Sequence, residues 1–287
     1  MAATFRAALI QMTSSTDVAE NVATASGMIR AAARDGAQLV ATPEMTTLLE
    51  RRRKAVLAGS HPEEEDPALP VLRDLAAELG IHLLIGSMPI RLGPQSLANR
   101  SIFIGPDGDI LARYDKIHRF DVTLGNGESY RESAVYEAGT EAVVARMPRA
   151  ALGLSVCYDL RFPHLYRDLA KAGADILMVP AAFTRTTGRA HWHVLMRARA
   201  IETGCFVLAP AQTGQHADGR ETYGHSLAVA PWGEVLADGG EPAGVTLVDL
   251  DLSEVAAARA RIPALEHDRE YAMRSAPRMS ARKEWAT

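Results

Sequence analysis

The chain contains the stretch Ala33-Arg-Asp-Gly-Ala-Gln-Leu-Val-Ala-Thr-Pro43, which is echoed later by Lys171-Ala-Gly-Ala-Asp-Ile-Leu-Met-Val-Pro180. Each stretch reads as the end of a helix, a glycine, a short apolar strand and a proline. A repeated unit of this kind predicts two similar halves. If each half carries a sheet, the two sheets are expected to pack face to face with the helices outside.

Strands and helices alternate on both sides of this repeat. We expect a first strand at Thr4 to Ile10, a helix from the N-cap Asp17 to about Arg34, and a helix at Pro67 to Leu79. Further strands are expected at 37–42, 81–85, 100–104, 109–113, 152–156, 175–179, 206–209, 225–230 and 244–249, and further helices at 162–172, 190–203 and from 253. Several strands adjoin without a helix between them, which favours an α/β fold with mixed sheets. Residues 114–136 are expected to form a long polar loop, and such loops are usually functional.

The bulk composition is typical of a globular protein. The chain has 287 residues, of which 47% are hydrophobic and 23% charged, and no linker divides it, so we expect a single domain over 1–287. The net charge of 31 − 35 = −4, with scattered basic residues, argues against a nucleic-acid partner. No signal segment or long apolar run is present, and the two cysteines form no disulfide framework. These features favour a cytoplasmic location without a membrane contact.

Cys157 is the first candidate for chemistry. It follows the apolar run Leu152-Gly-Leu-Ser-Val156 and precedes a polar turn into a helix, which is the position of a nucleophile on a strand-to-helix turn. N–H groups at the start of that helix are suited to binding an oxyanion and to lowering the pKa of the thiol. The alternative is a small buried hydrophobic side chain, which is the interpretation given to Cys205, in the middle of a strand.

Three charged residues are weaker candidates when taken singly. Glu44 ends a strand in Thr-Pro-Glu-Met, where burial is expected to raise its pKa toward that of a general base; the alternative is a helix-capping acid. Lys116, in Tyr-Asp-Lys-Ile-His at the start of the polar loop, is placed to polarise a carbonyl oxygen, although most lysines in such surroundings are solvated. Glu132, in Tyr-Arg-Glu-Ser, has the least support of its own.

Other chemistries have less support. His191, His193 and His225 are possible partners for a Cys–His pair, but no protease-like sequence accompanies Cys157. Histidines two residues apart on a helix point to different faces, so His191 and His193 predict no metal site. No Gly-Lys-Ser/Thr loop exists for phosphate, and no cofactor is expected.

Taken together, the motifs Thr-Pro-Glu44-Met, Tyr-Asp-Lys116-Ile-His and Ser-Val-Cys157-Tyr-Asp-Leu-Arg-Phe-Pro resemble the three signatures of the carbon–nitrogen hydrolase (nitrilase) superfamily, in order and spacing. The resemblance covers nearly the whole chain. It implies a four-layer α-β-β-α sandwich with two mixed sheets face to face, which dimerises through its helical layers. It also implies catalytic roles for Glu44, Lys116, Cys157 and Glu132.

The resemblance further implies a mechanism. Glu44 removes the proton of Cys157, the thiolate attacks an amide carbonyl, and Lys116 with the Tyr158 N–H holds the oxyanion, so that ammonia leaves and water hydrolyses the thioester. Glu132 orients Lys116 and the substrate nitrogen. Nitrilases of the superfamily typically have Cys-Trp-Glu where this chain has Cys157-Tyr-Asp, so amide hydrolysis is favoured over nitrile hydrolysis. The remaining alternative is a non-catalytic binding protein of the same fold.

The expected substrate is a small acidic molecule ending in a primary amide. Arg161, four residues after the nucleophile, is suited to holding a carboxylate, and its alternative role is an ion pair with Asp159 or Glu202. The resemblance implies that Phe183, Thr184 and Thr187 line the pocket.

Three enzyme branches of the superfamily are compatible with such a substrate: deaminated glutathione amidase, ω-amidase acting on α-ketoglutaramate, and N-carbamoyl amino acid amidohydrolase. The segment 211–226 resembles the first branch. The chain has Gly188-Arg189-Ala-His-Trp-His193 where the superfamily usually has Gly-Pro-Ala-His-Trp-Glu, and the extra arginine is a candidate to favour a second carboxylate.

A polar C-terminal tail at 266–287 lacks apolar periodicity. Such a tail is expected to lie across a partner subunit, which together with the resemblance predicts a homodimer or a higher homo-oligomer.

Overall fold

The computed structural model describes residues 4–124, 127 and 129–274 and has two mixed six-stranded sheets. The first sheet has the order β16 (Gly244–Asp251), β1 (Thr4–Gln11), β2 (Leu39–Ala41), β3 (His82–Arg91), β4 (Leu97–Ile104) and β5 (Ile110–Asp115). The second has the order β15 (Val235–Asp238), β14 (Leu227–Val229), β11 (Phe206–Ala209), β10 (Ile176–Met178), β9 (Ala151–Leu154) and β8 (Val144–Arg146). In each sheet three parallel strands form the centre, and antiparallel strands flank them.

The two sheets repeat one topology, as the echo between the two quoted stretches predicts. The parallel strands β1, β2 and β3 correspond to β9, β10 and β11, and in both sheets the third of them is followed by two antiparallel strands. The helices that precede β2 and β10 are α1 (Val18–Arg34) and α4 (Pro163–Lys171). The remaining members of each helix layer are α3 (Ala68–Leu79) and α5 (Arg185–Thr203).

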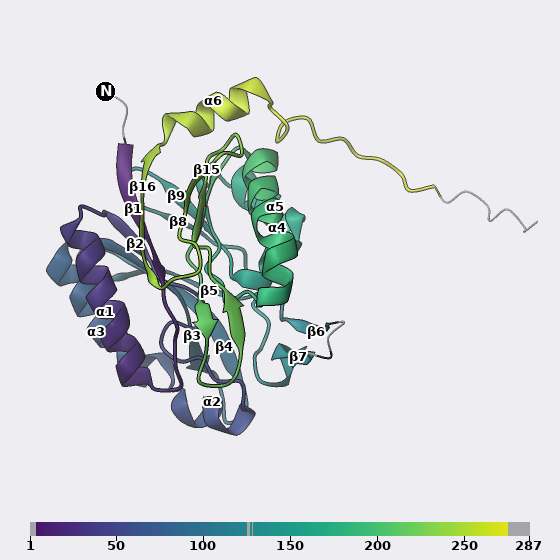
Figure 1. The fold of residues 1–287 in the computed structure, drawn as a ribbon. Coiled ribbons are helices and arrows are strands. Elements are labelled where there is room, and N and C mark those ends of the chain that lie inside the picture. The colour runs from purple at the N-terminus through teal and green to yellow at the C-terminus, as the bar shows by residue number, and fades with distance from the viewer. Residues whose placement is uncertain (1–3, 125–126, 128, 275–287) are drawn as a thin grey trace, which may run out of the picture.

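Helices cover the outer face of each sheet, and the inner faces meet (Figure 1). Strand alternation produces this arrangement: on β1, Leu9 points into the core shared with the second sheet, whereas Ile10 packs in a separate core with Ile29 of α1. The layers are therefore α1 and α3, the first sheet, the second sheet, and α4 and α5, which confirms the predicted four-layer α-β-β-α sandwich. No helix in the described part of the chain is long and apolar enough to cross a membrane.

Several elements differ from the sequence-based expectation. The helix α5 begins at Arg185 rather than near 190, because the Thr184 side chain caps it by accepting the Thr187 N–H; its first turn, which contains a glycine, shows no apolar period. The polar loop at 114–136 contains a hairpin of β6 (Asp121–Thr123) and β7 (Ser129–Arg131) and a 3-10 helix at Glu132–Ala134.

The remaining elements are short. They are α2 (Arg53–Gly59), a 3-10 helix at Glu63–Glu65, a 3-10 helix at Cys157–Arg161, the hairpin β12 (Thr213–Gln215) and β13 (Glu221–Tyr223), and α6 (Ser253–Arg261). After α6 the chain contacts α4 through Ala264 and Asp268, and the described residues that follow leave the body of the molecule as an extended coil (Figure 1). Residues 275–287 of the predicted partner-binding tail lie outside the described residues.

Candidate active site

A cavity of about 350 Å³ is lined by residues that follow strands of both sheets. Eight of the nine site residues predicted from the sequence line it, and they are Glu44, Lys116, Glu132, Cys157, Tyr158, Phe183, Thr184 and Thr187. The ninth, Arg161, does not. The geometry thus brings together residues separated by more than a hundred positions in the chain.

Cys157 lies on a strained turn at this cavity. Its φ of 49° places a non-glycine residue in the left-handed region, and it opens the 3-10 helix that follows β9. Its N–H donates to Pro180 O at 3.0 Å, which ties the turn to the end of β10. The side chain is 8% exposed, so it is accessible only through the cavity. This is the geometry of a nucleophile held on a rigid backbone.

Glu44 and Lys116 form a buried ion pair facing Cys157. Lys116 Nζ donates to Glu44 Oε1 at 2.8 Å, and the two side chains are 3% exposed for the lysine and 6% for the glutamate. The other oxygen of Glu44 accepts the Ala182 N–H at 2.8 Å, so the carboxylate also bridges to the second sheet. Glu44 sits directly before Met45, which has a φ of 56°. A second strained turn therefore positions the proposed base.

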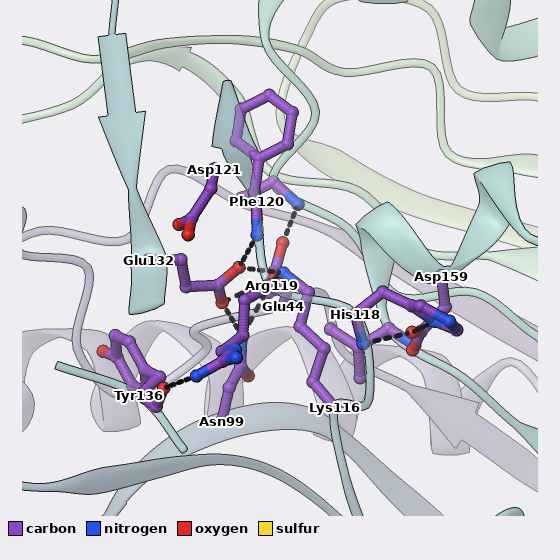
Figure 2. A network of polar contacts seen from close by, with 12 residues as sticks. Glu44, Asn99, Lys116, His118, Arg119, Phe120, Asp121, Glu132, Tyr136 and Asp159 are labelled. Carbon is purple, nitrogen blue, oxygen red and sulfur yellow. Dashed lines mark hydrogen bonds and ion pairs between the residues drawn. The ribbon is translucent and has the colours of Figure 1, made fainter. Parts of the chain in front are cut away.

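Glu132 completes the group from the 3-10 helix that follows β7. Its two carboxylate oxygens lie 3.0 and 2.9 Å from Lys116 Nζ, and Oε2 accepts the Phe120 N–H at 2.6 Å (Figure 2). Asn99 on β4 donates through Nδ2 to Glu44 at 2.9 Å and to Glu132 at 3.1 Å. Asn99 links both carboxylates, and the sequence analysis missed it. Asn99, Arg100 and Ser101 are three consecutive polar residues in Leu97-Ala-Asn-Arg-Ser-Ile-Phe-Ile104, so the sequence alone did not single out Asn99.

The charges of this group are set by burial and by mutual contact. Burial alone would raise the pKa of Glu44, but the charge and hydrogen bond of Lys116 hold it below its usual value. The expectation of a raised pKa for Glu44 is therefore wrong. It took account of burial but not of the Lys116 ammonium, which lies 2.8 Å away. Burial would lower the pKa of Lys116, yet Glu132 and Glu44 raise it well above its usual value, so Lys116 is an ammonium.

The environment of Cys157 favours the neutral thiol. Burial and the negative charge of Glu44 raise its pKa well above the usual value, and Lys116 opposes this only in part. We expected the N–H groups at the helix start to lower the pKa of this thiol, but burial and Glu44 raise it instead. A protonated thiol beside an ionised carboxylate is the starting state for a proton transfer from sulfur to Glu44 during attack.

A second polar network fixes the nucleophile turn relative to Lys116. Asp159 is fully buried and accepts hydrogen bonds from Tyr114 Oη at 2.6 Å, from the His118 N–H at 3.0 Å and from the Val156 N–H at 2.8 Å. Its Oδ1 also lies 2.7 Å from His118 Nδ1 (Figure 2). Asp159 therefore joins the segment on both sides of Lys116 to the turn that carries Cys157.

The residues predicted to bind substrate divide into two groups. Phe183, Thr184 and Thr187 line the cavity at the start of α5. Arg161 does not line the cavity: its guanidinium is 5.4 Å from the ring centre of Phe183, and its Nη2 is 3.3 Å from His191 Nδ1. Among the described residues it forms no ion pair with Asp159 or Glu202. Its role as a direct substrate ligand stays a prediction, and the guanidinium contacts the Phe183 ring without lining the cavity.

The histidines proposed as alternative partners do not line the cavity. His193 Nε2 and His225 Nδ1 each lie 2.9 Å from a carboxylate oxygen of Asp238. Their ligand atoms lie within 4.8 Å of one another, so within the described chain they form a His–Asp–His cluster in which each imidazole is paired with the carboxylate. This chain departs from the usual superfamily sequence at two positions, Arg189 and His193. His193 contacts Asp238, and neither residue lines the cavity.

The structure brings Glu44, Lys116 and Cys157 together between two mixed sheets, and the family comparison identifies the class of protein. Residues 6–260 match the carbon–nitrogen hydrolase family. The chain belongs to this family and is an amidohydrolase that cleaves carbon–nitrogen bonds of amides.

Individual proteins of known name or structure resemble this chain over most of its length. The chain is 40% identical over 271 residues to the deaminated glutathione amidase of Synechocystis sp., covering 92% of this chain and 97% of that one. The structure resembles the C. elegans NitFhit protein with a TM-score of 0.85 and 36% identity, covering 93% of this chain and 65% of that longer one. It also resembles a mutant of the amidase from Nesterenkonia sp. AN1, in which acrylamide has added to the active-site cysteine, with a TM-score of 0.77 and 28% identity over 90% of this chain and 98% of that one.

Proposed function

We propose that Cys157 is the nucleophile and Glu44 the general base of this amidase. The observation that carries the proposal is that Lys116 contacts both Glu44 and Glu132 in one cavity that Cys157 also lines. As Cys157 Sγ attacks the amide carbonyl carbon, the thiol proton passes to Glu44 and the carbonyl electron pair moves onto oxygen. Lys116 and the Tyr158 N–H, at the open start of the 3-10 helix, stabilise that oxyanion.

The tetrahedral intermediate then collapses. The C–N bond breaks, Glu44 returns the proton to the leaving nitrogen, and a thioester remains on Cys157. Water loses a proton to Glu44 and attacks the thioester, the C–S bond breaks, and the proton goes back to sulfur. Glu132 keeps the ammonium of Lys116 in place throughout, since both of its oxygens lie within 3.0 Å of Nζ.

We propose deaminated glutathione as the preferred substrate, with α-ketoglutaramate and N-carbamoyl amino acids as the alternatives. The proposal is supported by the relatives at 38–40% identity that carry this name and by a cavity whose lining includes four arginines: Arg51, Arg53, Arg131 and Arg220. Deaminated glutathione contains no primary amide, so the leaving group in its hydrolysis is an amine. This refines the expectation of ammonia release, which applies to α-ketoglutaramate.

Replacing the nucleophile tests the proposed mechanism. We expect Cys157→Ala to lose at least about 10³-fold in kcat/KM while its thermal unfolding stays near that of the wild type, because the side chain faces a cavity. The wild type is assayed for release of the peptidyl amine from deaminated glutathione and for release of ammonia from α-ketoglutaramate. A higher kcat/KM on deaminated glutathione supports the substrate proposal. Retained turnover in Cys157→Ala would refute covalent catalysis, whereas equal or reversed preference would refute only the substrate.

Thiol labelling gives an independent control. Acrylamide is expected to modify Cys157, which opens to the cavity, and to spare Cys205, which is fully buried with its Sγ 3.3 Å from Ala174 O. Mass spectrometry of labelled peptides distinguishes the two. Equal labelling of both cysteines in folded protein would contradict the assignment.

We also propose that the protein acts as a cytoplasmic homodimer built from a single domain over 1–287. Large apolar side chains are exposed on the outer helix layer, with Val194 at 68% and Ile201 at 55% on α5. On the tail that follows α6, Tyr271 and Met273 are 83% and 87% exposed. Apolar surface of this kind is typical of a protein–protein contact.

A further inference from the structure

Arg220 is a cavity-lining cation with unmet hydrogen-bonding capacity. It precedes β13, its side chain is 20% exposed, and its Nε is buried without a hydrogen-bond partner among the described residues. The nearest carboxylate oxygen is Asp218 Oδ2, at 3.9 Å. A buried donor without an acceptor is destabilising unless a ligand supplies the acceptor.

The backbone around Arg220 is fixed. The Asp218 side chain accepts the Arg220 N–H at 2.9 Å, and the His216 N–H donates to Arg220 O at 2.8 Å. The guanidinium carbon lies 5.8 Å from the ring centre of Tyr130, which is within the range of a cation–π contact. The guanidinium is therefore held against one wall of the cavity before any ligand arrives.

The other buried charges of the cavity are matched. Lys116 is paired with Glu44 and Glu132, as described above. Glu50 is paired with Arg52, whose Nη2 lies 2.6 Å from Glu50 Oε2. Among the described residues Arg220 has only a long ion pair, with Asp218 at 3.9 Å, and its buried Nε has no hydrogen-bond partner, so an anion is the ligand that the cavity favours there.

Aromatic rings connect Arg220 to the nucleophile. The ring of Tyr130 is 5.1 Å from that of Phe120, and the ring of Phe120 is 5.0 Å from that of Tyr158, the residue after Cys157. The catalytic side chains Glu44 and Lys116 are almost completely buried, whereas Arg220 is partly exposed. Arg220 is therefore closer to solvent than the catalytic pair, on the side of the cavity mouth.

We propose that Arg220 binds a carboxylate carried by the leaving group of the amide substrate. This inference rests on the proposed covalent mechanism, in which the leaving group departs before water enters. If the leaving group lies between the acyl group and the cavity mouth, it can leave as soon as the C–N bond breaks. If the acyl group lay nearer the mouth, the thioester would block its exit. The substrate class is accordingly an amide of an amino acid or short peptide with a free C-terminal carboxylate.

Binding to catalytically inactive protein tests this inference without turnover. The probes are deaminated glutathione and its C-terminal carboxamide, which differ only in the carboxylate. Calorimetry is performed on Cys157→Ala, on Cys157→Ala with Arg220→Gln, and on Cys157→Ala with Arg185→Gln. Arg185 is the matched control, since it also carries one positive charge, paired with Glu241, but does not line the cavity.

We expect the free acid to bind Cys157→Ala about 10- to 100-fold more tightly than the carboxamide, which is the range for a charge-assisted hydrogen bond. The ratio of the two affinities, free acid to carboxamide, should fall to near one when Arg220→Gln is added and should persist when Arg185→Gln is added. A ratio near one in Cys157→Ala, or a ratio that survives Arg220→Gln, would overturn the assignment. Failure of either probe to bind would also overturn it, whereas the covalent mechanism is decided separately by the loss of turnover in Cys157→Ala.

Discussion

At the scale of single residues, the site depends on a compact ammonium. Lys116 contacts two carboxylates within 3.0 Å in a position where its side chain is only 3% exposed. An arginine carries the same charge but is larger and planar, and it presents its donors in a fixed fork. That fork cannot reproduce the three contacts that the ammonium makes with Glu44 and Glu132.

We therefore expect Lys116→Arg to lower kcat by about 10²–10³-fold, the usual loss when one oxyanion donor is removed. Lys171→Arg serves as a control, because Lys171 pairs with Asp268 on the surface of α4 and is 42% exposed. Steady-state kinetics with both variants, alongside thermal unfolding, provides the measurement. Wild-type turnover in Lys116→Arg would remove Lys116 from the oxyanion site.

At the scale of elements, the first turn of α5 forms one wall of the cavity. Gly188 lies in that turn, and a Cβ added there would come within 2.3 Å of the Tyr223 ring on β13. The Tyr223 N–H also donates to Phe183 O at 2.9 Å. The glycine thus allows α5 to pack directly on the hairpin that is adjacent to Arg220.

We expect Gly188→Ala to lower the free energy of unfolding by about 1–3 kcal/mol through overpacking, and to reduce kcat/KM by shifting the cavity wall. At an uncrowded helix position, a Gly→Ala substitution usually stabilises the helix by up to about 1 kcal/mol. Gly27→Ala in α1 is the matched control, since an added Cβ there meets nothing within 4 Å. Denaturant unfolding and kinetics compare the two. A stable, fully active Gly188→Ala would show that the wall is not set by this contact.

The elements that the sequence predicts well are those with a local signal. The end of α1 with β2 and the end of α4 with β10 were recognisable because glycine, apolar residues and proline follow each helix in the same order. Glu44 and Cys157 were recognisable because each follows a strand. The hairpin of β6 and β7 and the start of α5 escaped prediction, since their polar sequences have no apolar period and tertiary contacts decide their structure.

The contacts that the sequence could not reveal are those between distant segments. Asn99 is one of three consecutive polar residues on β4, and only the packed fold brings it to both Glu44 and Glu132. Arg161 was expected to reach the substrate because it is near Cys157 in sequence. Its guanidinium contacts the ring of Phe183 without lining the cavity, while Arg220, 63 positions after Cys157 (220 − 157 = 63), lines it.

At the scale of the whole molecule, the site exists only where the two halves meet. Glu44 and Lys116 follow strands of the first sheet, and Cys157 follows a strand of the second. Gly86 permits this approach, because a Cβ there would lie 2.5 Å from Pro180 and 2.6 Å from the carbonyl oxygen of Pro43. These are the prolines that end the two repeated stretches. Packing of the repeat therefore determines the distance between base and nucleophile.

The proposed dimer extends the same sandwich by its outer helices. Val194 and Ile201 are seven residues apart on α5, so they share one face of the helix, and Trp232 and Ile262 are also exposed, at 46% and 60%. An isolated monomer would leave these apolar side chains in water. Burial against a second copy removes that exposure.

We expect Ile201→Lys to weaken the dimer by at least about tenfold, because burying an unpaired ammonium at an apolar contact is costly. Val71→Lys is the matched control: Val71 is 47% exposed on α3, in the opposite helix layer. Light scattering and sedimentation at micromolar concentration measure the assembly of both variants and of the wild type. A monomeric wild type would refute the proposed dimer. A dimer unaffected by Ile201→Lys but dissociated by Val71→Lys would move the interface to the layer of α1 and α3.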